Sequence, residues 1–188
     1  MTVTVAKPSF PTRIALILIE RAERRLGVSL DYVRQIAEAD LGLLKRYNRV
    51  FGFLDPNHHV PRDAYAAARI RGALAADCGT CVEAEVNLAR KAGVPRKTID
   101  AILAGDMGLP APLPAILHLS DAVTRTREDA PEARQEIIAH FGQRGLIELS
   151  FAMNGAALLP GIKRAMGHAT ACDLGAMARI RPEGDDTA

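Results

Sequence analysis

Residues 61–93 read PRDAYAAARIRGALAADCGTCVEAEVNLARKAG, and this stretch decides the fold. Pro61 is suited to open a helix through the alanine-rich half. A second helix is predicted over Cys78–Lys91, with Asp77 as its N-cap. Alanine, leucine, arginine and glutamate abound here and in the rest of the chain, and these residues favour helices over strands. We therefore predict an all-α protein.

Prolines and glycines divide the remaining chain into further helix-sized pieces. These helices are expected over residues 11–25, 30–46, 95–104, 113–127, 131–141 and 145–167, the last interrupted at Pro160. The 145–167 segment is apolar around nearly its whole circumference, so it is predicted to be buried. A second subunit that covers part of it would make the protein a homo-oligomer, while a central helix in a monomer explains the pattern equally well.

Length and composition set the domain organisation and exclude several partners. The chain has 188 residues, enough for one core, which we divide into an N-terminal helical extension packed on the core (1–60), the core (61–176) and a flexible C-terminal tail (177–188). The formal net charge is only +2, which argues against nucleic acid or a membrane surface as partner. The apolar run at 14–19 is too short for a signal peptide or membrane span, so we predict a cytoplasmic protein.

The candidate chemistry lies in two closely spaced cysteines. Three cysteines are too few for a disulfide framework, and Cys78 and Cys81 are three residues apart, on one helix face. Glu85 follows four residues later on the same face. Free N–H groups at the start of a helix favour a thiolate. We predict Cys78, Cys81 and Glu85 as catalytic residues, in which one thiolate attacks, the other resolves and the carboxylate carries a proton; buried, inert thiols are the alternative.

Two stretches carry a resemblance to a known family. RIRGALAADCGTCVEAEVNLARKAGVPRKTIDAILAGD (69–106) and LLPGIKRAMGHATAC (158–172) resemble the carboxymuconolactone decarboxylase superfamily, nearest to its alkylhydroperoxidase D (AhpD-like) branch. The resemblance covers about residues 60–172. It implies an all-helical AhpD-like bundle, an oligomer such as a dimer, trimer or hexamer, and a cytosolic dithiol that reduces peroxides and is re-reduced by an upstream disulfide carrier.

Three polar positions depart from the redox branch. Its pattern is Glu-x₁₁-Cys-x-His-Cys-x₃-His, and Ala66, Thr80 and Glu85 stand where the pattern has glutamate, histidine and histidine. A carboxylate is a far weaker base than a histidine near neutral pH. The hypothesis is that a desolvated Glu85 replaces the family's proton-relay histidine.

The resulting prediction is an AhpD-like thiol-disulfide oxidoreductase with peroxidase (peroxiredoxin-type) activity. Its partners are expected to be a small-molecule hydroperoxide or a protein disulfide or dithiol electron donor. The alternative is a non-redox oligomeric member of the family with a ligand-binding or other role. No Gly-rich phosphate loop, serine-nucleophile motif or dinucleotide fingerprint is present, so no cofactor is expected.

Other polar residues give weaker signals. Cys78, Cys81, His168 and Cys172 have ligand types that suit zinc, but a zinc knuckle sits in a turn rather than at a helix start, so no metal is expected. His58 and His59 are read as solvent-facing loop residues, with a metal site or a substrate entrance as alternatives. Arg69 and Arg71 precede the thiols, and either could steady a thiolate, although exposed arginines are more usual.

Overall fold

The computed structural model describes residues 9–53 and 58–168, and in these ranges it holds eight α-helices, one π-helical turn and no strand. The all-α prediction is confirmed. The predicted tail at 177–188 lies outside the described residues. The elements are α1 (Phe10–Leu26), α2 (Asp31–Ala39), α3 (Leu41–Phe53), α4 (Arg62–Ala75), α5 (Gly79–Lys91), α6 (Arg96–Ala104), α7 (Leu113–Asp121), the π-helix η1 (Ala122–Thr126) and α8 (Pro131–Ala165).

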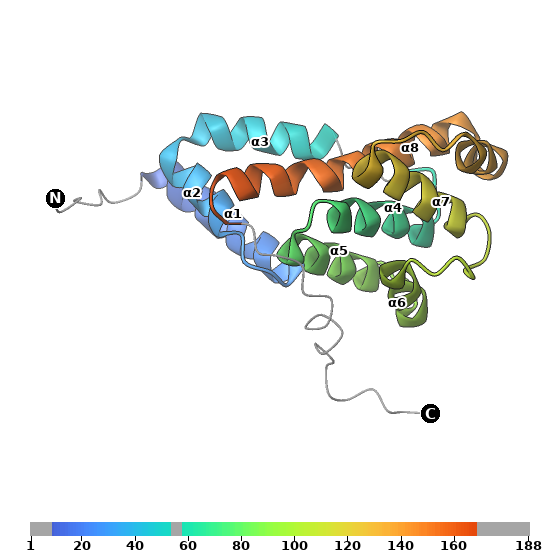
Figure 1. Cartoon of the computed structure of the whole chain (residues 1–188). Helices are drawn as coiled ribbons and strands as arrows, with labels where there is room; N and C mark the ends of the chain where they lie inside the picture. The colour runs from blue at the N-terminus through green and yellow to red at the C-terminus, as the bar shows by residue number, and fades with distance from the viewer. Residues whose placement is uncertain (1–8, 54–57, 169–188) are drawn as a thin grey trace, which may run out of the picture.

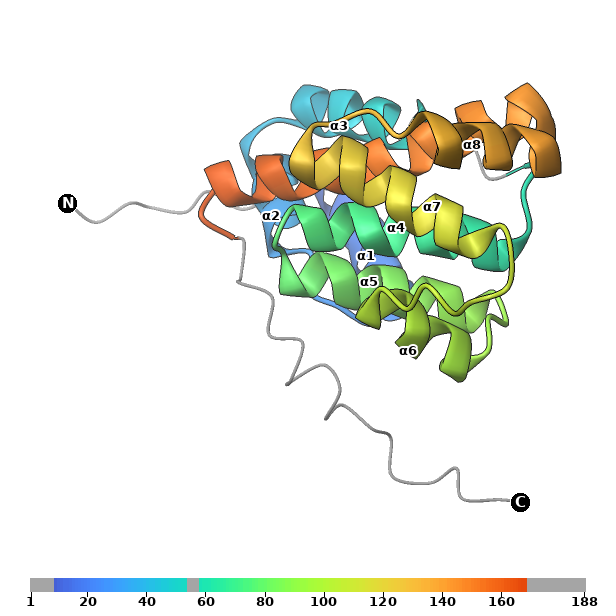
Figure 2. The ribbon, with the colours of Figure 1, turned by 45° about the vertical axis from the view of Figure 1, so that its right-hand side comes forward.

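Helix α4 is the centre of the bundle. It packs against α5, α6, α7 and α8, which surround it in both ribbon views (Figures 1 and 2). Every residue from Ala64 to Ala73 is buried, and the many alanines let the neighbouring helices approach closely. At Gly72 an added Cβ would lie 2.1 Å from the backbone oxygen of Met153 in α8, so only glycine fits there.

Helix α8 differs from the prediction in two ways. Its non-helical residue is Gly142, with φ 67°, which confirms the expected division between the 131–141 and 145–167 segments. The interruption predicted at Pro160 is wrong, because the helix continues through this buried proline to Ala165. Nor is the helix buried all round, since Ile147 and Leu158 are about half exposed.

By length and composition α8 could span a membrane, but apolar core helices meet the same criterion, and α8 packs on α4 and α7.

Helices α1, α2 and α3 form a second layer with its own hydrophobic cluster, which we call the N-terminal layer. Tyr32 and Val33 of α2 are buried there, together with Ile19 of α1 and Leu44 of α3. Contacts between α1 and α5 join this layer to the bundle. The single helix predicted over 30–46 is wrong: the chain is extended at Asp40, whose carboxylate accepts hydrogen bonds from the backbone of the following turn and so begins α3.

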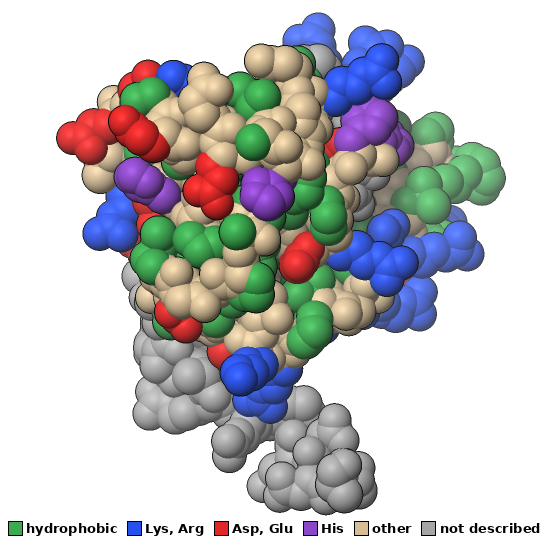
Figure 3. Space-filling model, turned by 90° about the vertical axis from the view of Figure 1, so that its right-hand side faces the viewer, with side chains coloured by type: hydrophobic (Ala, Val, Ile, Leu, Met, Phe, Trp, Pro, Cys, Tyr) green, Lys and Arg blue, Asp and Glu red, His purple; other side chains and the backbone are tan. Residues whose placement is uncertain are grey.

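The surface shows two different characters. At the end of the bundle drawn in Figure 3, acidic, basic and apolar side chains are interspersed, without one sign of charge covering the face. On α1, by contrast, large apolar side chains are exposed: Phe10, Ile14, Ile17 and Leu18 have between 46% and 74% of their area accessible. Only part of the apolar stripe of α1 is therefore used in the protein's own core.

Candidate active site

The turn between α4 and α5 places the two thiols. Asp77 has a left-handed conformation (φ 48°), and Cys78 is the N-cap of α5, so the prediction of Asp77 as N-cap is wrong by one residue. Arg164 of α8 donates hydrogen bonds to the carbonyl oxygens of Ala76 (3.0 Å) and Asp77 (2.6 Å). The turn that presents Cys78 is thus held by a helix distant in sequence.

The two sulfur atoms are in contact. The Sγ atoms of Cys78 and Cys81 are 2.6 Å apart, so one thiol can donate a hydrogen bond to the other. Cys78 is fully buried, whereas Cys81 is partly exposed and lines a small cavity of about 70 Å³ that Glu85 also lines. Cys81 thus contacts Cys78 and lines one cavity with Glu85, while the catalytic roles of the three residues stay a prediction.

The surroundings of the two thiols shift their pKa values in opposite directions. The hydrogen bond from Cys81 lowers the pKa of Cys78 to about 6; the backbone N–H of Cys81 and the positive charges of Lys163 and Arg164 act in the same direction, and desolvation opposes them. The same shared hydrogen bond raises the pKa of Cys81, as do burial and the negative charges of Cys78 and Glu85. Near neutral pH the pair therefore holds one proton and one negative charge.

The carboxylate of Glu85 forms an ion pair with Arg69. Its two carboxylate oxygens accept hydrogen bonds of 2.7 and 2.6 Å from Nε and Nη2 of Arg69, whose side chain is only 4% exposed. Arg71, two residues along α4, pairs with Asp121 and donates to the carbonyl oxygens of Ile102 and Leu103. The charge of each arginine is thus engaged by a carboxylate, and neither is the cation that lowers the pKa of Cys78.

The cations that lower the pKa of Cys78 are Lys163 and Arg164 of α8, neither of which was predicted from the sequence as a site residue. Lys163 is 6% exposed, lines the small cavity with Cys81 and has its Nζ 5.7 Å from the centre of the Tyr32 ring. No carboxylate among the described residues pairs with it in an ion pair. A detectable signal was present, because Lys163 and Arg164 directly follow the uncharged run GAALLPGI (155–162).

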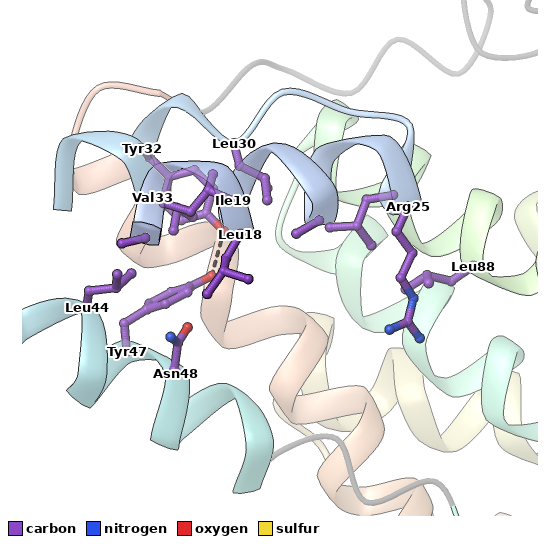
Figure 4. Close-up of a pocket in the computed structure, with 13 residues that line it drawn as sticks. Leu18, Ile19, Arg25, Leu30, Tyr32, Val33, Leu44, Tyr47, Asn48 and Leu88 are labelled. Atoms are coloured by element: carbon purple, nitrogen blue, oxygen red, sulfur yellow. Dashed lines mark hydrogen bonds between the residues drawn. The ribbon is translucent and has the colours of Figure 1, made fainter. Parts of the chain in front are cut away.

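A larger cavity adjoins the thiol site on the side of the N-terminal layer. This N-terminal pocket, of about 350 Å³, is lined by residues of α1, α2, α3 and α5 (Figure 4). Tyr32 lines both cavities, and its hydroxyl group is 2.6 Å from that of Tyr47. Burial raises the pKa of both tyrosines, so both phenols stay neutral.

The possible zinc ligands and the two loop histidines, His58 and His59, were weaker predictions from the sequence. The Nε2 atom of His168 is 2.7 Å from the side-chain oxygen of Gln35, and Cys172 lies outside the described residues, so the four-ligand zinc set is not tested. Across 9–53 and 58–168 no group of three or more His, Cys, Asp or Glu side chains is arranged to hold a metal ion. The backbone N–H groups of His58 and His59 donate to the buried carboxylate of Glu148, a loop anchor that the sequence did not reveal.

Comparison with known proteins shows the fold. No protein-family profile and no curated protein matches the chain. The structure is similar to two crystal structures of the debrominase Bmp8, the apo protein and a cysteine-to-alanine variant in complex with 2,3,4-tribromopyrrole. Both have a TM-score of 0.72, at 17% and 16% identity, and cover 94% and 95% of this chain and 96% of theirs. The chain has the AhpD-like fold. The N-terminal layer falls within this coverage, although the sequence resemblance began only near residue 60.

Proposed function

We propose that this protein is a dithiol oxidoreductase of the AhpD-like branch, in which Cys78 and Cys81 reduce a small oxidised substrate and close to a disulfide. The observation that carries the proposal is the 2.6 Å contact between a buried sulfur of lowered pKa and a second sulfur that lines a cavity. A thiolate and an accessible thiol in contact are what a two-electron reduction by a dithiol requires.

The reaction is written for a hydroperoxide, ROOH. The shared proton first moves onto Cys78, which is placed to donate it to the sulfur of Cys81. The thiolate of Cys81, which faces the cavity, then attacks the terminal oxygen: the S–O bond forms, the O–O bond breaks, and the leaving alkoxide takes the proton from Cys78, which becomes the thiolate. The thiolate of Cys78 then attacks the sulfur of Cys81, and hydroxide leaves as the S–S bond forms. Two electrons pass from sulfur to oxygen, and the products are ROH, hydroxide and a disulfide, which an external dithiol reduces again.

Glu85 is retained as a proposed proton carrier. It lines the same cavity as Cys81 and is 12% exposed, while Arg69 holds it in place. In the proposed role its carboxylate takes up a proton from solvent and transfers it to the hydroxide that leaves, which becomes water. Glu85→Gln tests this role: we expect slower disulfide closure and an altered pH profile, and an unchanged profile would remove Glu85 from the mechanism.

The test of the proposed function is disulfide mapping by mass spectrometry after treatment with one equivalent of hydroperoxide. We expect a rapid Cys78–Cys81 disulfide that a dithiol reverses, and its formation also in Cys172→Ser. Cys81→Ser is expected to abolish the reaction, and Cys78→Ser to stop it at a sulfenic acid. Slow, non-selective oxidation would instead favour the non-redox, ligand-binding alternative.

A second candidate reaction is reductive removal of bromine from an aromatic ring. It is favoured by the similarity to the debrominase Bmp8 along 94% of this chain, including the helices that form the N-terminal pocket. The balance is ArBr plus two thiols giving ArH, bromide, a proton and a disulfide. Bromide release from a brominated pyrrole in the presence of a dithiol, measured by ion chromatography, would distinguish this reaction from peroxide reduction.

We further propose a homo-oligomer that acts in the cytoplasm, where a reducing environment maintains free thiols. The exposed apolar residues Phe10, Ile14 and Ile17 of α1 support a second copy as the partner. Ile17→Glu is expected to reduce the molar mass measured by light scattering to that of a smaller assembly, while Lys97→Glu on α6 leaves it unchanged. A monomeric wild-type protein would contradict this proposal.

A further inference from the structure

We propose that the N-terminal pocket binds the organic part of the substrate, and that its ligand is an uncharged, mainly apolar molecule with one hydroxyl or carbonyl group. This inference rests on the proposed function and names the ligand class for it. The site lies mainly in the N-terminal layer, and Leu88 of α5, the helix that carries Cys81, completes its wall.

The size and walls of the pocket suit a small organic molecule. Its volume of about 350 Å³ falls at the lower end of the range for small-molecule sites, roughly 300–1,000 Å³. Most of its wall is aliphatic, including Ala22, Leu18 and Ile19 of α1 and Leu44 of α3, while Tyr32 and Tyr47 add two aromatic rings. Such a surface gains binding free energy mainly by removing apolar area from water.

The polar groups of the pocket define the rest of the ligand. Of the described residues that line it, Arg25 alone carries a charge, and its side chain is exposed. A buried ionic group on the ligand would therefore lack a partner, which is costly. The hydroxyl groups of Tyr32 and Tyr47 share one hydrogen bond, so one O–H remains to donate to a ligand oxygen (Figure 4).

The pocket is positioned to deliver its ligand to the thiols. Leu26, Leu30, Tyr32 and Leu88 line both the N-terminal pocket and the small cavity of Cys81. The small cavity, at about 70 Å³, has room for a reacting group but not for a whole organic molecule. A ligand seated in the larger pocket would thus extend its reactive end past Tyr32 toward Cys81.

The experiment uses 2-naphthol, an uncharged aromatic alcohol, as probe in isothermal titration calorimetry with the full-length protein. We expect a dissociation constant on the order of 100 µM. Ala22→Phe, which fills the pocket, is expected to weaken binding at least tenfold. Ala39→Phe, at the exposed end of α2 and away from the pocket, is the matched control and should bind as the wild type does.

A second measurement connects the pocket to the thiols. In Cys172→Ser, saturating 2-naphthol is expected to slow alkylation of Cys81 by N-phenylmaleimide several-fold, as read by peptide mapping. Binding without this protection overturns the proposal, because the pocket would then not lead to Cys81. Absence of 2-naphthol binding also overturns the proposal. If Ala22→Phe in addition dissociates an oligomer, the pocket is assigned to a subunit interface.

The outcomes separate this inference from the proposed function. If hydroperoxide closes the Cys78–Cys81 disulfide but 2-naphthol does not bind, the redox function stands and the pocket proposal fails. If 2-naphthol binds and protects Cys81 but no disulfide forms, the pocket stands as a ligand site and the redox function fails.

Discussion

The bundle around α4 and the N-terminal layer differ in how closely their helices pack. Around α4, alanines and Gly72 allow close contact between helix backbones. In the N-terminal layer, larger side chains surround a cavity of about 350 Å³, and several apolar residues of α1 remain exposed. Closely packed regions hold groups in fixed positions, whereas loosely filled ones can accept a ligand. The thiols lie at the border, where Lys163 of α8 meets Tyr32 of α2.

The largest expected difference between the two regions is the effect of a glycine-to-alanine substitution on the free energy of unfolding. Gly72→Ala should lower the free energy of unfolding by about 3 kcal/mol, because its Cβ would collide with the backbone of α8. Gly52→Ala in α3 meets no atom within 4 Å and should instead raise it by about 0.5 kcal/mol through helix propensity. Urea unfolding measures both. Equal effects would mean that the bundle is no more tightly packed than the N-terminal layer.

The ion pairs offer a second contrast. Arg69 is 4% exposed beside Glu85, whereas Arg34, which pairs with Glu23 in the N-terminal layer, is 33% exposed. Arg69→Met should lower the free energy of unfolding by about 3 kcal/mol, because it leaves the carboxylate of Glu85, which is only 12% exposed, without its partner. Arg34→Met should cost only about 1 kcal/mol, as expected of a partly exposed pair.

The pair of Arg34 and Glu23 also has a measurable pH dependence. Hydrogen bonds from Arg34 lower the pKa of Glu23 below its usual 4.5, so this pair stabilises the folded protein above that pH and loses its contribution as the pH falls through the lowered pKa. The difference between wild type and Arg34→Met in thermal unfolding should therefore shrink in acid. A difference independent of pH would show that the pair acts through packing alone.

The smallest expected effect is a change in the fraction of thiolate at Cys78, which lies at the border between the bundle and the N-terminal layer. In Cys172→Ser, thiolate absorbance at 240 nm should disappear as the pH falls through about 6, because that is the lowered pKa of Cys78. Lys163→Met should move this midpoint upward and reduce the thiolate present at pH 6 by roughly threefold. Lys97→Met, at an exposed position of α6, is the control and should leave the titration unchanged. An unshifted midpoint in Lys163→Met would show that Lys163 does not lower this pKa, and would leave the hydrogen bonds from Cys81 and the charge of Arg164 as its causes.

Local sequence signals predicted most of the bundle, because helix periodicity and turn residues act over a few positions. They placed α4, α5 and α6 to within a residue or two and brought Cys78, Cys81 and Glu85 to one face. They failed at Asp40, where a single capping carboxylate divides a helix, and at Pro160, where buried surroundings keep a helix continuous. Both outcomes depend on geometry that composition does not encode.

The rest of the site depends on contacts between distant segments. Lys163 and Arg164 approach the thiols across more than eighty residues, and Tyr32 comes from a layer to which the family resemblance did not extend. Glu85 was predicted to be a desolvated proton carrier, and its partner was not foreseen: a buried arginine on the preceding helix donates to both of its oxygens. Spacing along one helix identified the proposed reacting groups, but not the charges that set the acidity of the thiols.

The contact between Tyr32 and Tyr47 has a practical consequence. The chain contains three tyrosines and no tryptophan, so two of its three strong intrinsic fluorophores lie in the N-terminal pocket, with ring centres 5.9 Å apart. Tyrosine emission of the unlabelled protein is therefore weighted toward this one location. Oxidation of the nearby thiols or entry of a ligand can be followed as a change in emission, without adding a dye.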